Sequence, residues 1–218
     1  MFESIYVLIA LIGSTIAGVW DFKTTNIPDS VCIGMIVSGI LLHGYESYSL
    51  GSLDPLMSSF LVGGLFLLFG LIMYYTGQWG GGDGELLAAI GFLLPTATAP
   101  TFFAFPISFF VNLILISAIY GIGYTLYLMV KPGVKRKGLM FYRRIPVSKL
   151  KVDDVLGEDL PRLKLFKKKI KGLTKEDIKK IKRYKKFVTV TEGIPTGIVF
   201  PIALAFTLYF GDLILLLV

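Results

Sequence analysis

The chain has 218 residues, 54% of them hydrophobic, and its mean hydropathy is +0.72. This apolar balance exceeds that of ordinary water-soluble domains and indicates a membrane protein. The formal net charge is +7, and the single cysteine, Cys32, excludes both a disulfide framework within the chain and a Cys-rich metal site.

Long apolar segments with few charges recur along the chain. Because lipid offers no hydrogen-bond partners, such segments must form helices that satisfy their own backbone groups. The expected spans are residues 4–20, 30–43, 56–76, 86–95, 102–130 and 194–218. We therefore predict an all-α membrane protein with about six transmembrane helices. Its expected parts are helices one to five (1–130), a basic cytoplasmic loop domain (131–191) and helix six (192–218).

The charges predict the orientation of these spans. Residues 131–191 hold 21 of the 22 Lys and Arg residues but only 6 of the 15 acidic residues. Basic segments next to spans stay on the cytoplasmic side, so we place this loop inside the cell. Counting spans backwards then puts the loop with Lys23 inside and the loop with Glu46 and Asp54 outside. The predicted location is the cell membrane, with several passes.

Two aspartates fall at the same predicted membrane face. Asp21 lies at the inner end of the first span, and Asp83 lies at the inner start of the fourth. Ionisable groups near membrane depth are costly and indicate a functional site. Two neighbouring carboxyl groups tend to hold one proton between them, which is the condition for aspartic protease chemistry. No metal or other cofactor is expected, and no Ser/His or Cys/His arrangement competes with this pair.

Three glycines precede the second aspartate. Gly80, Gly81 and Gly82 carry no side chains and can leave room for another backbone beside Asp83. We interpret them as clearance for a substrate backbone. The alternative is a flexible turn before a helix. Among other polar residues, His43 is expected as an interfacial side chain, and Asn112 is expected to hydrogen-bond to another helix.

These patterns resemble the archaeal preflagellin/prepilin peptidases, which are membrane aspartic proteases related to bacterial type IV prepilin peptidases. The family motif Gly-x-Gly-Asp matches Gly80 to Asp83, and the family pattern around the first aspartate matches DFKTTNIPD, which begins at Asp21. The late segment TEGIPTGIVFPIAL is similar to the start of the last helix in archaeal members.

The resemblance implies Asp21 and Asp83 as the catalytic pair of an aspartic endopeptidase. It also implies the substrates, which are preflagellins or type IV prepilin-like precursors cut on the cytoplasmic side. The cut removes a short basic leader from a hydrophobic helix that stays in the membrane. Many bacterial members have Lys two residues after the second aspartate, where this chain has Glu85. We interpret Glu85 and Lys23 as candidates for tuning the protonation of the two aspartates.

The basic loop contains one amphipathic segment. Thr174 and Asp177 predict a capping box, after which apolar residues including Ile178 and Ile181 fall on one helical face. We favour contact of this helix with anionic lipid over packing on the loop's own core, and we expect no nucleic acid partner. The acidic cluster Asp153, Asp154, Glu158 and Asp159 is a second hypothesis, as a receptor for the basic leader.

Two other functions use the same aspartates. A presenilin-like or signal-peptide-peptidase-like enzyme would cut within the spanning helix of its substrate. A proton- or cation-coupled transporter would use Asp21 and Asp83 as ion sites. The position of both aspartates at one membrane face, rather than in the middle of a span, argues against the transporter.

Overall fold

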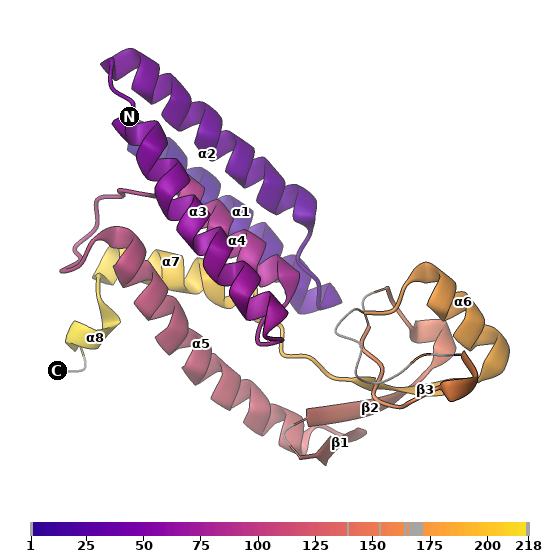
Figure 1. Cartoon of the computed structure of the whole chain (residues 1–218). Helices are drawn as coiled ribbons and strands as arrows, with labels where there is room; N and C mark the ends of the chain where they lie inside the picture. Colours follow the sequence, from indigo (N-terminus) through magenta and orange to yellow (C-terminus); the bar gives the residue numbers. More distant parts are fainter. Residues whose placement is uncertain (1, 139, 153, 164, 166–171, 217–218) are drawn as a thin grey trace. The chain divides into compact units, whose positions relative to one another are not determined.

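The computed structural model describes residues 2–138, 140–152, 154–163, 165 and 172–216 (Figure 1). The chain divides into two compact units. Unit 1 comprises Met1–Gly121 and Pro195–Val218, and unit 2 comprises Ile122–Ile194. Each unit is described by itself.

Unit 1 is helical, as predicted. Four helices in the described part of the chain are long and apolar enough to cross a membrane, namely α1 (Phe2–Thr24), α2 (Asp29–Leu50), α3 (Asp54–Tyr75) and α5 (Phe105–Val130). Two further apolar helices are shorter, α4 (Gly81–Leu93) and α7 (Val199–Phe210). Six spans in all therefore stay a prediction.

Helix α4 lies at the centre of unit 1. Its residues from Leu86 to Leu93 are buried, and α1, α2 and α3 pack around it (Figure 1). Glycines allow α3 and α4 to touch along their backbones. A Cβ built on Gly70 would lie 2.5 Å from the Cα of Gly84, so neither position has room for a side chain.

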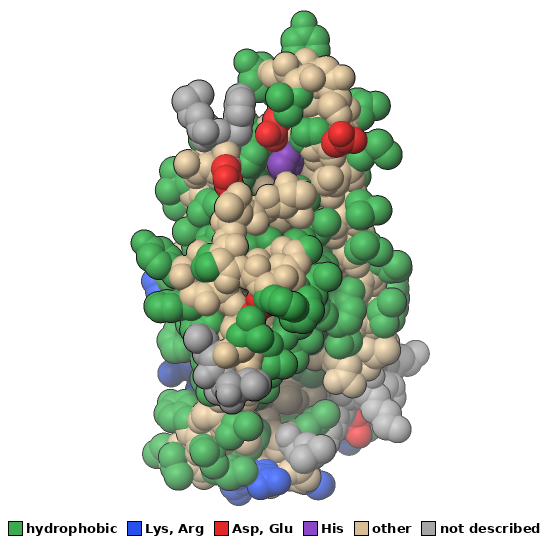
Figure 2. Space-filling view, turned by 90° about the vertical axis from the view of Figure 1, so that its left-hand side faces the viewer, with side chains coloured by type: hydrophobic (Ala, Val, Ile, Leu, Met, Phe, Trp, Pro, Cys, Tyr) green, Lys and Arg blue, Asp and Glu red, His purple; other side chains and the backbone are tan. Residues whose placement is uncertain are grey.

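Acidic side chains and the single histidine gather at one end of unit 1, above a flank of hydrophobic side chains (Figure 2). There Tyr6 of α1 donates a hydrogen bond to Glu46 of α2 at 2.7 Å. His43 is 4% exposed, stacks on Tyr6, and lies 3.2 Å from the carbonyl of Leu93 at the end of α4. The expectation of an interfacial His43 is wrong, because the end of α4 and Tyr6 cover its ring.

The last apolar segment is not one continuous helix. Residues around Pro195 and Gly197 precede α7, and Gly211 ends it with a positive φ of 77° before α8 (Leu213–Leu216). Pro195 has no N–H for a helical ladder, and Gly211 adopts a backbone that other residues avoid. Asn112 of α5 donates hydrogen bonds to Thr207 and to the Gly211 carbonyl, at 2.9 and 2.7 Å. The predicted contact of Asn112 with another helix is confirmed.

Unit 2 contains a sheet that the sequence did not predict. Its strands β1 (Val134–Lys137), β2 (Met140–Pro146) and β3 (Phe187–Thr191) are antiparallel in the order β1-β2-β3. Two short 3-10 turns, η1 (Val147–Lys149) and η2 (Pro161–Leu163), lie between β2 and α6 (Lys175–Tyr184). The predicted capping box of Thr174 and Asp177 begins α6 and is confirmed.

The apolar side of α6 packs inside unit 2. Ile178 and Ile181 join Ile145, Val188 and Val190 in one buried cluster, and Ile181 is 0% exposed. The preference for lipid contact by this apolar stripe is therefore wrong. Packing against the unit's own sheet removes these apolar side chains from water, so they need no contact with a membrane.

Ion pairs hold the ends of unit 2. Glu192, which follows β3, forms ion pairs with Lys131 at 2.6 Å and with Arg143 at 3.1 Å. Of the acidic cluster, Glu158 pairs with Lys185 at 3.0 Å, and Asp154 accepts the N–H of Lys151. Asp153 lies outside the described residues. Whether this cluster receives a leader stays a prediction.

Candidate active site

Asp21 is buried near the end of the first spanning helix. It is 6% exposed, although it follows an exposed Trp20 and precedes an exposed Phe22 on α1. Its Oδ2 accepts a hydrogen bond of 2.8 Å from the backbone N–H of Gly197. A helix places every third or fourth side chain on one face, so Asp21 points into unit 1 while its neighbours point out.

Asp83 lies in the first turn of α4. Its Oδ2 accepts the N–H of Gly80 at 3.2 Å, which satisfies one of the free donors at the helix start. Gly80 has no side chain, so this is the half of a capping box that can form here. The other oxygen, Oδ1, accepts a hydrogen bond of 2.8 Å from the Thr196 hydroxyl.

The two aspartates are tied to consecutive residues of the chain. Asp83 binds the side chain of Thr196, and Asp21 binds the next peptide N–H, that of Gly197. One residue's covalent span plus two hydrogen bonds limits the separation of the bonded carboxylate oxygens to roughly 10 Å. The two carboxylates interact electrostatically. The structure thus brings together the two predicted residues from α1 and α4.

Thr196 and Gly197 are functional candidates that the sequence reading did not single out. They lie in the segment between Pro195 and the start of α7, which was expected to be helical. A small polar residue next to glycine, just before a final apolar helix, is the sequence signal that could have identified them. Gly197 also has no room for a side chain, because its Cβ would lie 2.9 Å from that of Asp21.

The glycines of the motif, Gly80 to Gly82, differ in the space around them. A Cβ built on Gly82 would lie 2.7 Å from the Cβ of Ile27, so Gly82 makes room for the chain's own residue. At Gly81 the nearest neighbour is the Tyr74 ring at 3.8 Å, and at Gly80 it is an oxygen of Asp83 at 3.3 Å. The expected clearance for a substrate therefore does not extend to Gly82, and for Gly80 and Gly81 it stays a prediction.

Lys23 and Glu85 flank the aspartates. Lys23 is exposed near the end of α1, while Glu85 is half-buried one turn into α4. The Oε2 of Glu85 is buried with no hydrogen-bond partner among the described residues, and Asp29 repels this carboxylate electrostatically. Tuning of the aspartates by either residue stays a prediction.

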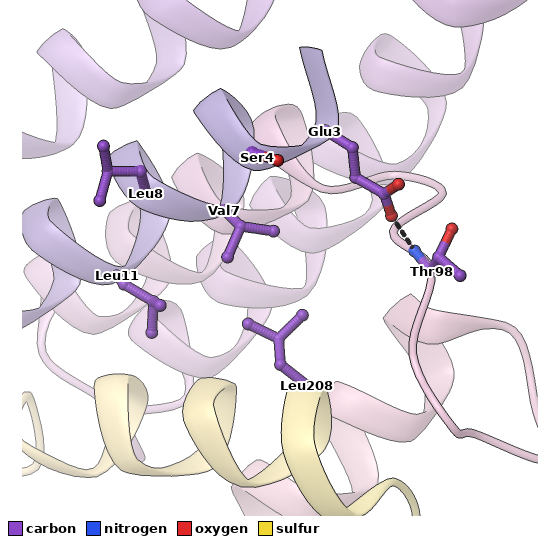
Figure 3. A pocket seen from close by; sticks show the side chains of 7 residues that line it. All are labelled: Glu3, Ser4, Val7, Leu8, Leu11, Thr98 and Leu208. Carbon is purple, nitrogen blue, oxygen red and sulfur yellow. Dashed lines mark hydrogen bonds between the residues drawn. The ribbon is translucent and has the colours of Figure 1, made fainter. Parts of the chain in front are cut away.

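A separate hollow lies at the far end of α1. It measures about 420 Å³, and Figure 3 shows the Glu3 carboxylate reaching the N–H of Thr98 across one side of it. Apolar side chains of α1 and Leu208 of α7 line the rest (Figure 3). Its lining residues on α1 run from Glu3 to Leu11, which lie roughly three to five helical turns from Asp21, and we assign it no part in the site.

Comparison with known proteins adds to this geometry. The type IV leader peptidase family matches residues 8–126, a range that contains both aspartates and the glycine motif. The preflagellin peptidase of Methanococcus voltae is 32% identical over 148 residues, and the match covers 62% of this chain and 62% of that protein.

Two further preflagellin peptidases are similar. That of Methanocaldococcus jannaschii is 33% identical over 94 residues, 43% of this chain and 39% of the relative. That of Methanococcus maripaludis is 31% identical over 117 residues, 48% of this chain and 50% of the relative. The matched region thus spans less than two thirds of each relative. Because the family match covers more than half of the chain and both aspartates, this protein belongs to the type IV leader peptidase family.

Proposed function

We propose that this protein is an aspartic endopeptidase that removes the leader from preflagellins or type IV prepilin-like precursors. The observation that carries the proposal is the convergence of Asp21 and Asp83 on Thr196 and Gly197. Membership of the leader peptidase family and the three preflagellin peptidase relatives support the reaction and the substrate class.

The hydrogen bonds divide the four carboxylate oxygens into two kinds. A backbone N–H can donate but cannot accept, so the Oδ2 atoms of Asp21 and Asp83 serve as acceptors. The proton of the pair is then held at one of the two Oδ1 atoms. The Thr196 hydroxyl can donate to an ionised Oδ1 of Asp83 or accept from a protonated one, so it suits both states.

The reaction follows from this arrangement. The ionised carboxylate takes a proton from water as the water attacks the scissile carbonyl. The protonated carboxyl group donates a hydrogen bond to the carbonyl oxygen, and a proton then passes to the leaving amine. Water must reach both Oδ1 atoms, and the start of α4 is the more open side because Gly81 is exposed.

We also propose the membrane face. Asp21 and Asp83 lie at the end of unit 1 that carries Lys23, opposite the end with Glu3 and Glu46. The basic residue marks the cytoplasmic side. The substrate's short basic leader would then be cut in the cytoplasm, while its hydrophobic helix stays in the bilayer.

Co-expression of an archaeal preflagellin with the full chain tests the proposal. Wild type should shorten the precursor by its leader, and Asp21→Asn and Asp83→Asn should each abolish this. Asp54 begins α3 at the end of unit 1 opposite the two aspartates, so Asp54→Asn is the matched control and should cleave normally. Full cleavage by either active-site variant would exclude Asp21 and Asp83 as the catalytic pair.

The same experiment separates the alternatives. A product cut within the hydrophobic helix, identified by mass spectrometry, would favour a presenilin-like enzyme. Cation flux into vesicles that depends on both aspartates, without any proteolysis, would favour a transporter.

A further inference from the structure

One face of the sheet in unit 2 lies away from the unit's buried core and carries several exposed side chains. The strand register places Arg144 opposite Thr189, with Lys135 opposite Tyr142. These positions alternate with Ile145 and Val188, which face the core. The face away from the core also carries Tyr142, which is 8% exposed. Its exposed residues include Lys135, Lys137, Met140, Arg144 and Phe187, and we call these five residues the open sheet face.

The open sheet face combines positive charge with exposed apolar groups. Lys135, Lys137 and Arg144 are exposed, and within the described residues the ion pairs of unit 2 involve other basic residues. Phe187 is 49% exposed and Met140 is 54% exposed. The Arg144 guanidinium lies 5.2 Å from the centre of the Phe187 ring. An aromatic ring beside basic groups is the composition of segments that lie at a membrane interface.

A hollow beside Phe187 is suited to an anionic head group. It measures about 430 Å³ and is lined by Arg144, Glu158, Lys185, Lys186, Phe187 and Thr189. Glu158 is already paired with Lys185. Arg144 and Lys186 therefore leave the hollow with a net positive charge.

Unit 2 is also held at the bilayer. It includes the end of α5, where Ile122, Leu126 and Val130 are exposed on a helix apolar enough to span a membrane. Strand β1 begins at Val134, four residues after α5 ends. So short a connection spans at most about 14 Å, so it keeps the start of the sheet near the end of this apolar helix and gives the sheet a high effective concentration at the lipid surface.

We propose that the open sheet face docks on the anionic phospholipid surface of the membrane in which the helices sit. Arg144 and Lys186 take a lipid phosphate in the hollow, and Phe187 enters the head-group layer. The lipid is the occupant that the charge and the tether both favour. This inference goes beyond the proposed protease activity and does not depend on it.

The test uses the full chain in lipid nanodiscs. Cys32→Ala removes the single cysteine, and Phe187→Cys then carries an environment-sensitive fluorophore. A second reporter at Met140→Cys keeps Phe187 in place. Both labels should report water in phosphatidylcholine discs and should shift to an apolar environment when phosphatidylglycerol is included.

Two charge variants with matched composition sharpen the test. Lys135→Gln/Lys137→Gln/Arg144→Gln removes three charges from the open sheet face. Lys179→Gln/Lys180→Gln/Lys182→Gln removes three exposed charges from α6, which packs on the other face of the sheet. Each basic residue near an anionic surface is worth about a fivefold preference, so the first variant should weaken docking roughly a hundredfold. The α6 variant should weaken it less than about fivefold, because charges beyond a Debye length are screened.

Three outcomes would overturn the proposal. Labels that stay in water in both lipids exclude docking, and equal effects of the two triple variants exclude a specific face. An oligonucleotide that shifts the labels in neutral discs, where anionic lipid does not, assigns the face to nucleic acid instead. Normal leader cleavage in detergent by both triple variants shows that they fold, and loss of cleavage in the first alone would place the face in the protease site.

Discussion

Thr196 and Gly197 hold the two aspartates from one point of the chain. Hydrogen bonds from a peptide N–H and a hydroxyl stabilise the buried carboxylate of Asp21 and the half-buried carboxylate of Asp83, which would otherwise be costly in this apolar unit. Because one donor is backbone, its contribution cannot be removed by changing a side chain. The Thr196 hydroxyl, in contrast, can be removed alone.

Thr196→Val keeps the shape of the side chain and removes its hydroxyl. Hydrogen bonds to charged groups contribute about 1.5–3 kcal/mol, so we expect leader cleavage to slow by about one to two orders of magnitude. Thr196→Ser keeps the donor and should retain most activity. Initial rates with purified full chain check this, and a Val variant as fast as wild type would remove Thr196 from the site.

Substitutions at Gly81 and Gly82 can distinguish a glycine needed for packing from a glycine that leaves room for the substrate. Gly82→Ala forces a Cβ against Ile27 at 2.7 Å, and overpacking of this kind costs about 1–3 kcal/mol. Its melting temperature in detergent should therefore fall. Gly81→Ala meets Tyr74 at an ordinary 3.8 Å and should not change the melting temperature.

If Gly81 provides clearance for the substrate backbone, Gly81→Ala should still raise KM for the precursor. An unchanged KM would leave Gly81 as part of the turn before α4 and nothing more.

Helices α3 and α4 contact one another backbone to backbone in unit 1. Their contact at Gly70 and Gly84 lies one residue beyond Asp83, so the fit of these two helices also sets the position of the aspartate. Without a hydrophobic driving force between helices in lipid, close backbone packing is a main source of association.

Gly70→Ala tests this contact. Its Cβ would lie 2.5 Å from the backbone of Gly84, which cannot move as a side chain can. We expect a loss of about 1–3 kcal/mol of stability and a lower kcat through displacement of Asp83. Gly64→Ala, on the same helix with nothing within 4 Å, is the control and should behave as wild type. Equal behaviour of the two variants would show that α3 and α4 adjust freely.

For the whole molecule, the charge distribution makes a prediction about orientation. Asn26 follows α1 at the end that holds the aspartates, and Ser49 lies in the last turn of α2 at the opposite end. Both residues are exposed. Single cysteines can therefore be placed at either end in the Cys32→Ala background.

An impermeant maleimide added to intact cells should label Ser49→Cys and should label Asn26→Cys only after the membrane is opened. Mass shifts of the purified chain measure both reactions. Labelling of Asn26→Cys from outside would reverse the proposed topology and place the aspartates on the external face.

Residue chemistry along the chain predicted the membrane class, the helices of unit 1 and both aspartates. These features depend on local composition: apolar runs must form helices in lipid, and charged residues within them are rare and conspicuous. The capping box of α6 was also readable, since it joins residues three apart. The bounds of the last helix could not be predicted. Pro195 and Gly211 interrupt it, but they lie in or beside one apolar segment, and only the backbone angles show where the helix begins and ends.

Tertiary structure alone decided the rest. In the sheet of unit 2, β2 pairs with β3 between residues that lie roughly 40 to 50 positions apart along the chain. The strands are short, and β1 and β2 are rich in Lys and Arg, so no clear alternation marks the sheet in the sequence. The apolar stripe of α6 could face lipid or a core, and only packing chose the core. Likewise, Thr196 and Gly197 reach Asp83 and Asp21 across more than a hundred residues, a contact that no local pattern encodes.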